Sequence, residues 1–103
     1  MNRVRFVSDD TYAFLASLPD NLVAKVFGLL EILDQFGVHL GPPKLKKITK
    51  DIYELRILGK ISIRILCTFY NDEIYILHAF IKKTQKLPKR ELSKAVSRLM
   101  YLH

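Results

Sequence analysis

The chain has 103 residues, half of them hydrophobic, which suffices for one modest core and is too little for two. Lys and Arg number 17 against 10 Asp and Glu, so the net charge is +7, and a lone cysteine rules out an internal disulfide. No apolar stretch approaches the roughly 20 residues that a membrane-spanning helix requires, and no signal peptide is visible, so we expect a cytoplasmic protein with no membrane partner.

The basic charge is concentrated in the second part of the chain. Residues 1–43 hold three cations and five anions, whereas residues 44–103 hold 14 cations and five anions. This asymmetry favours a polyanionic partner, with nucleic acid as the first candidate. A solvated basic face would give the same pattern, so charge alone leaves both explanations open.

The N-terminal part of the chain predicts one short strand and two helices. Residues 3–7 alternate like a strand, and residues 9–18 carry apolar side chains at helical spacing. Pro19 interrupts this run, and residues 22–36 then form an apolar stripe with a period of 3.6. Gly37 is a natural stop, because glycine accepts the left-handed conformation that ends many helices. The two helices are expected to form an antiparallel hairpin.

A run of strands follows the stiff Gly41–Pro43 connector. Four strands are expected, at residues 44–48, 52–58, 61–70 and 74–81. Gly59–Lys60 is expected to be a two-residue hairpin turn, and Asn71–Asp72 makes the next turn. The last strand is apolar almost throughout, as in a central strand that is covered on both faces.

The chain is expected to end in a third helix. Residues 82–86 form a polar loop, and Pro88 suits the first turn of a helix whose apolar side chains recur up to Leu99. The element order is β-α-α-β-β-β-β-α, with helices segregated from strands that are linked as hairpins. This order predicts one α+β domain over residues 1–103, with an antiparallel sheet.

Several common kinds of site have no support in the sequence. His39, His78 and His103 are far apart, and no paired Cys or His spacing indicates a metal site. The four glycines are scattered, so no phosphate-binding glycine loop is present. Cys67 lies inside an apolar strand and is expected to be a reduced, buried, small hydrophobe.

Polar residues of the predicted strands suggest a site of another kind. Alternation places Glu54, Arg56 and Arg64 on the face opposite the apolar side chains of their strands. If those apolar faces meet the helices, the three polar residues gather on an open, basic sheet surface. The loop after the last strand is expected to border this surface with three lysines, Lys82, Lys83 and Lys86.

A basic surface of this kind suits RNA cleavage, in which the neighbouring 2′-hydroxyl attacks the phosphate and no external nucleophile is needed. Arginine binds two phosphate oxygens at once, and a well-placed donor contributes roughly 3 kcal/mol to catalysis. The proton carrier stays open between Glu54, His78 and a lysine.

Each of these residues also has an ordinary structural explanation. Glu54 and Arg56 can simply neutralise neighbouring charges, His78 fits a satisfied core or interface histidine better than a catalyst, and the lysines suit a solvated loop. Arg64 is harder to explain in this way, because burying an unpaired cation is costly. The residues alone indicate a basic α+β domain and leave RNA binding open beside a solvated basic face.

Three segments resemble the RelE/HigB toxins of the RelE/ParE superfamily, nearest to its phage-derived, HigB-like branch. They read Ile-Tyr-Glu-Leu-Arg-Ile at 52–57, Ile-Arg-Ile-Leu at 63–66 and, within 78–91, Lys-Lys-Thr-Gln-Lys-Leu-Pro. The resemblance implies a RelE-like fold, in which two N-terminal helices pack on a twisted antiparallel sheet with a C-terminal helix. It also implies the toxin of a type II toxin–antitoxin system, a ribosome-dependent endoribonuclease that cuts messenger RNA without a metal or other cofactor.

The resemblance also implies roles for residues. Those that stabilise the scissile phosphate fall on Arg64 and Lys83, and a cation of the preceding strand falls on Arg56. Glu54 stands where RelE has a strand lysine often proposed as the base, and completes the catalytic candidates. The expected RNA-binding residues are Lys46, Lys47, Lys82, Lys86 and Lys89. The implied partners are the ribosome with its messenger RNA and a cognate antitoxin, a helix-turn-helix protein of the HigA kind.

Two alternatives stay open. ParE-like relatives are non-enzymatic toxins that inhibit DNA gyrase, and their basic cluster is typically eroded, whereas Arg56, Arg64 and Lys83 are present here. The chain can also be an inactive relative that only binds its antitoxin. A DNA-damage response would distinguish the gyrase inhibitor, and the absence of toxicity would distinguish the inactive module.

Overall fold

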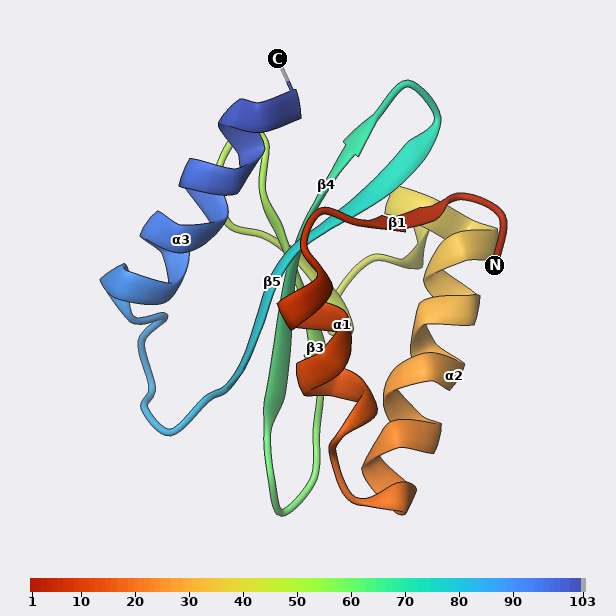
Figure 1. The fold of residues 1–103 in the computed structure, drawn as a ribbon, viewed down its shortest axis with the longest axis vertical. Helices are drawn as coiled ribbons and strands as arrows, with labels where there is room; N and C mark the ends of the chain where they lie inside the picture. The colour runs from red at the N-terminus through yellow and green to blue at the C-terminus, as the bar shows by residue number, and fades with distance from the viewer. Residues whose placement is uncertain (103) are drawn as a thin grey trace.

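The structure is a computed structural model that describes residues 1–102. His103, the third histidine of the sequence, lies outside the described residues. The helices are α1 (Asp9–Ala16), α2 (Asp20–Phe36) and α3 (Lys89–Leu99), with 3-10 turns at Gly37–Leu40 and Met100–Leu102. The strands are β1 (Val4–Phe6), β2 (Leu45–Lys47), β3 (Tyr53–Ile57), β4 (Ile63–Tyr70) and β5 (Glu73–Ile81). The expected order of elements is confirmed (Figure 1).

The five strands form one mixed sheet in the order β1-β5-β4-β3-β2. From β2 to β5, neighbouring strands are antiparallel, as expected. The expectation of a wholly antiparallel sheet is wrong, because β1 pairs with β5 in parallel, with Val4 opposite Ile74. Alternation along a strand predicts which side chains share a face, but it carries no information about the direction of a partner that is distant in sequence.

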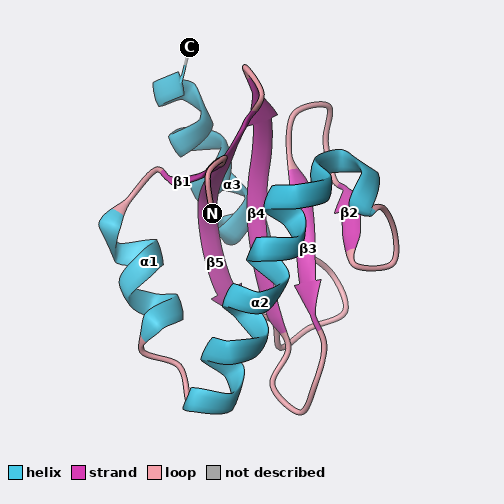
Figure 2. Ribbon diagram, turned by 90° about the vertical axis from the view of Figure 1, so that its right-hand side faces the viewer, coloured by secondary structure: helices cyan, strands magenta, loops and turns pink. Residues whose placement is uncertain are grey.

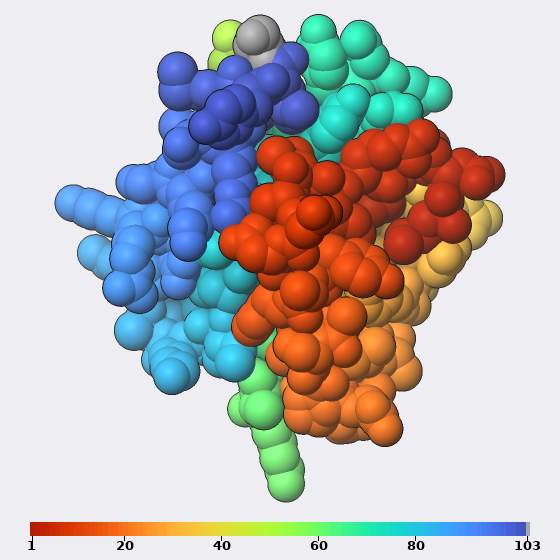
Figure 3. Space-filling view, in the orientation of Figure 1, coloured from red at the N-terminus to blue at the C-terminus, as the bar shows by residue number. Residues whose placement is uncertain are grey.

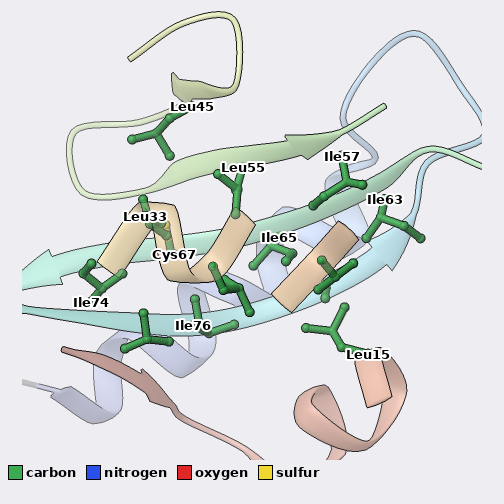
Figure 4. Packing of buried hydrophobic residues seen from close by; sticks show 14 residues of the cluster. Leu15, Leu33, Leu45, Leu55, Ile57, Ile63, Ile65, Cys67, Ile74 and Ile76 are labelled. Carbon is green, nitrogen blue, oxygen red and sulfur yellow. The ribbon is translucent and has the colours of Figure 1, made fainter. Parts of the chain in front are cut away.

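Helices cover both faces of the sheet. α2 crosses one face while α3 lies behind the other (Figure 2). The core beneath α1 and α2 joins Leu15 and Leu33 to strand residues such as Leu55, Ile65 and Ile76 (Figure 4). A smaller core beneath α3 is built from Ile52, Leu66, Leu77, Phe80 and Ala95.

α3 is tied to the rest of the fold by an arginine. Arg98 Nη1 donates to the carbonyl oxygen of Leu77 at 2.8 Å and to Oγ1 of Thr11 at 2.9 Å. Its Nη2 lies 3.0 Å from Oδ2 of Asp10, at the start of α1. One side chain therefore joins the last helix to the sheet and to the first helix.

The two hairpin turns differ from each other. Asn71 and Asp72 form the expected two-residue turn, because both have positive φ values, 50° and 62°, and β4 and β5 pair up to Tyr70 and Glu73. The expected two-residue turn at Gly59–Lys60 is wrong. Ile57 is opposite Ile63, which leaves the five-residue loop 58–62. The segment around residue 60 projects from the body of the molecule (Figure 3).

A β-bulge in β5 explains why this strand lacks a clean alternation. Leu66 is opposite His78 while Cys67 is opposite Ile76, so Leu77 is an extra residue. Leu77 packs in the α3 core, whereas Ile76 and Ala79 pack in the α2 core. The expectation of a strand covered on both faces is confirmed. None of the helices in residues 1–102 is sufficiently long and apolar to span a bilayer.

Candidate functional site

A basic hollow of about 460 Å³ lies where β3 and β4 meet the loop that leaves β5. Its wall is formed by Arg56, Ser62, Arg64, Lys82, Lys83, Thr84 and Gln85. Four of these residues are cations and none is an anion. The loop is fixed beside the strands because the backbone N–H of Lys82 donates to the carbonyl oxygen of Ser62 at 2.8 Å. Three separate segments of the chain thus bring positive charge to one place.

The two arginines of the hollow are cross-strand neighbours. Arg56 in β3 is directly opposite Arg64 in β4. Like charges in this position destabilise a sheet unless a counter-ion separates them. Glu54 is that counter-ion: its Oε1 lies 3.7 Å from Nε of Arg56, and its Oε2 lies 3.7 Å from Nε of Arg64. Glu54 and Arg56 thus neutralise neighbouring charges, as their ordinary structural explanation requires, and Arg64 joins the same cluster.

Arg64 is held in one orientation although it is almost inaccessible to solvent. Its side chain is 6% exposed, and its Nη1 donates to Oγ of Ser62 at 2.7 Å and to the carbonyl oxygen of Ile63 at 3.2 Å. Burial lowers the pKa of Arg64, and Glu54 counteracts this effect. The guanidinium still carries its charge, because arginine does not lose its proton in proteins. Within residues 1–102, no hydrogen bond is made by Nη2, which remains able to bind an oxyanion.

Glu54 lies beneath the arginines, with 3% of its side chain exposed. Its Oε2 and the Nε atoms of both arginines are buried without a hydrogen-bond partner in the described chain. At 3.7 Å the contacts are electrostatic and too long for hydrogen bonds. With 3% of its side chain exposed, this carboxylate is scarcely accessible to a substrate hydroxyl. The geometry therefore favours a positioning role for Glu54 over direct proton transfer.

The expected open sheet surface is only partly present. Glu54 and Arg64 lie on the face that α3 covers, since Glu54 is opposite Leu66 of the α3 core, and both are buried. The expectation of an open face is wrong for these two residues. A third layer of helix on this face could not be inferred from the alternation within β3 and β4. What stays accessible is the hollow beside the loop at residues 82–85.

The lysines predicted from the sequence divide into two groups. Lys82 is half-buried and Lys83 is exposed, and both line the hollow. Lys46 is exposed on β2 opposite Glu54, so it shares a face with the cluster without lining the hollow. Lys47 is opposite Tyr53 and belongs to the other face. The exposed residues Lys86 and Lys89 lie further along the loop and at the start of α3, outside the wall of the hollow.

Sequence reasoning missed three polar residues of the hollow: Ser62, Thr84 and Gln85. Ser62 orients Arg64, and its position two residues earlier in an alternating strand was the available signal. Thr84 Oγ1 donates to the carbonyl oxygen of Lys86 at 2.8 Å, which stabilises the turn of the lysine-rich loop. Both residues shape the site without adding charge.

His78 and Cys67 are placed outside this site. A 2.7 Å hydrogen bond joins Nε2 of His78 to Oε1 of Glu91 in α3, and the imidazole stacks on Phe80 at 5.7 Å. His78 is therefore the satisfied core histidine that was expected. Cys67 is buried, and burial raises the pKa of its thiol to about 12. Among residues 1–102 no three His, Cys, Asp or Glu side chains are grouped so that they could hold a metal ion.

Comparison with models of protein families gives a match over most of the chain. The model of the family described as phage derived protein Gp49-like (DUF891) matches residues 13–100, which include the second half of α1, all of α2, β2 to β5 and α3. This family is related to the RelE/HigB-type toxins and is associated with toxin–antitoxin systems. A search among curated proteins gave no significant match.

Proposed function

Since this chain belongs to the phage-derived Gp49-like family, we propose that it is a type II toxin that cuts messenger RNA on the ribosome. The single observation that supports this activity is the convergence of Arg56, Arg64, Lys82 and Lys83 on one hollow whose wall has no anion. A pocket of this charge and size suits one RNA phosphate and its neighbouring riboses. Activity on translating ribosomes would place the protein in the cytoplasm.

The proposed reaction is a transesterification within the RNA. The 2′-oxygen forms a bond to the adjacent phosphorus while the bond from phosphorus to the 5′-oxygen breaks, giving a 2′,3′-cyclic phosphate and a 5′-hydroxyl. The 2′-hydroxyl loses one proton and the leaving oxygen gains one. Lys82 and Lys83 are the groups of the wall that can exchange protons with these oxygens or with water beside them.

The arginines would stabilise the charge that grows on the phosphate during this step. The orientation of Arg64 is already fixed by Ser62 and Glu54, so little reorganisation is needed when the RNA binds. Preorganised donors in such sites are typically worth about 10²–10³-fold each in rate. This electrostatic contribution requires neither a metal nor a cofactor.

The deciding experiment is primer extension on cellular messenger RNA after the chain is expressed without an antitoxin. We expect growth arrest and new 5′ ends inside translated codons, which disappear when the start codon of the reporter message is removed. Arrest with a DNA-damage response and intact messages would instead identify a gyrase inhibitor. Unimpaired growth with intact messages would identify an inactive antitoxin-binding module.

A further inference from the structure

An apolar groove of about 400 Å³ runs between α2 and β3, on the face of the sheet that α2 partly covers. On the helix side it is lined by Ala24, Gly28 and Ile32, and on the strand side by Ile57 and Leu58. Ile32 is 39% exposed and Leu58 is 60% exposed. Large apolar side chains thus border a hollow that is open to solvent.

α2 has more apolar surface than its contact with the sheet uses. One row of its side chains, Leu22, Val26, Leu30 and Leu33, is buried. Ala24, Gly28 and Ile32 form a second row at intervals of four residues, which runs about 12 Å along another side of the helix. A helix that is apolar around most of its circumference is normally buried on all sides. The second row therefore indicates a contact that the isolated chain does not make.

Gly28 adds evidence for a close approach. A Cβ atom at this position would meet no atom within 4 Å, so nothing in the chain itself requires a glycine here. Glycine inside a helix is less favourable than alanine, and the backbone of Gly28 has no left-handed conformation that would explain it. A glycine on an exposed, apolar row permits another backbone or a large side chain to lie against the helix.

The charges around the groove define the chemistry of its occupant. Lys25, Lys44 and Arg56 belong to its lining and no Asp or Glu does. Lys25 closes one end, since its Nζ donates to the carbonyl oxygen of Leu58 at 3.0 Å. An occupant that matches both features carries apolar side chains for the floor and carboxylates for the rim.

Arg56 is part of both the apolar groove and the basic hollow. We propose that an acidic, amphipathic segment of the antitoxin binds in the groove, with apolar side chains over Gly28 and Leu58 and a carboxylate at the rim where Lys44 and Arg56 lie. The naming of the partner as an antitoxin rests on the proposed function. The bound segment would lie beside Arg56, which also lines the hollow, and would obstruct the approach of an RNA chain, so binding beside the site inhibits it without filling it.

The test uses the protein encoded beside this chain's gene as the probe, purified and titrated calorimetrically against three forms of the chain. Gly28→Trp fills the groove, whereas Gly28→Ala adds only one methyl group there. Both substitutions raise helix propensity relative to glycine, so Gly28→Ala is the matched control. We expect Gly28→Trp to weaken binding at least roughly tenfold and Gly28→Ala to leave it within about twofold of wild type. Unfolding curves of the two variants establish that both are folded.

Equal affinities of the three forms, or no binding of the probe to wild type, would overturn the proposal. Co-expression provides a second readout: Gly28→Trp should still arrest growth, and the probe should no longer relieve this arrest as it does for Gly28→Ala. If the wild-type chain causes no arrest, the proposed function fails, while the calorimetric comparison still decides whether the groove binds the partner.

Discussion

Nε of Arg64 lies 3.7 Å from Oε2 of Glu54, and both side chains are buried on the sheet face that α3 covers. The same carboxylate lies 3.7 Å from Nε of Arg56. One anion thus allows two arginines to stand opposite each other in adjacent strands. Removal of one member of a buried ion pair is strongly destabilising, because the remaining charge keeps its cost of burial.

Glu54→Gln is therefore expected to lower the free energy of unfolding by about 3 kcal/mol. Chemical denaturation measures this change, with Glu31→Gln as the matched control. Glu31 is 62% exposed and pairs with the N-terminal amine at 3.4 Å, so its loss should cost less than about 1 kcal/mol. A Glu54→Gln variant with unchanged stability and greatly reduced RNA cleavage would instead place the carboxylate on the substrate.

The cations of the hollow yield a prediction on activity. Arg64→Ala and Lys83→Ala are each expected to reduce messenger cleavage by about 10²–10³-fold, measured by primer extension, and to relieve growth arrest. Arg64→Lys should not restore cleavage, because a single ammonium cannot bond to Ser62 and to two phosphate oxygens in one plane. Lys94→Ala serves as the control, since Lys94 is an exposed lysine of α3 outside the hollow. Full arrest by both alanine variants would show that the site is elsewhere.

His78 should matter for stability and not for cleavage. His78→Phe preserves the stack on Phe80 but removes the 2.7 Å hydrogen bond to Glu91, whose side chain is mostly buried. A hydrogen bond to a charged group contributes about 2 kcal/mol, so we expect a loss of that order in the free energy of unfolding. His39→Phe changes an exposed histidine and should have little effect. If folded His78→Phe protein loses cleavage, the imidazole takes part in the reaction.

The sequence predicted best what depends on short-range pattern. Period-3.6 spacing located α2, alternation put Arg56 and Arg64 on the same face, and Asn71–Asp72 formed the expected turn. These features depend on neighbours within a few residues, where backbone geometry determines the outcome. The two arginines and the two lysines of the hollow were accordingly among the expected site residues.

The errors concern relationships that are distant in sequence. The parallel pairing of β1 with β5 joins residues that are about 70 positions apart, and no local pattern encodes its direction. The burial of Glu54 and Arg64 depends on α3, which packs on this face through Ala95 and is held by Arg98. The separation of Lys86 and Lys89 from the hollow depends on the path of the loop that follows β5. Charge composition cannot determine any of these arrangements.

The last prediction concerns stability at low pH and the N-terminal strand. Asp34 in α2 accepts hydrogen bonds from the backbone N–H groups of Arg3 at 2.6 Å and Val4 at 2.9 Å. Burial alone would raise the pKa of Asp34, but these N–H groups and that of Asn2 lower it below the ordinary value of 3.8. A carboxyl whose pKa is lower in the folded state stabilises the fold at pH values above its unfolded-state pKa. This contribution is lost as the pH falls through the folded-state pKa.

Asp34→Asn should thus reduce the free energy of unfolding by about 1 kcal/mol at neutral pH. The difference from wild type should shrink as the pH falls below 3.8, in denaturation curves recorded between neutral and strongly acidic pH. Asp51→Asn, at an exposed position, is the control and should change stability little, and a constant difference for Asp34→Asn would show that the charge of Asp34 does not hold β1.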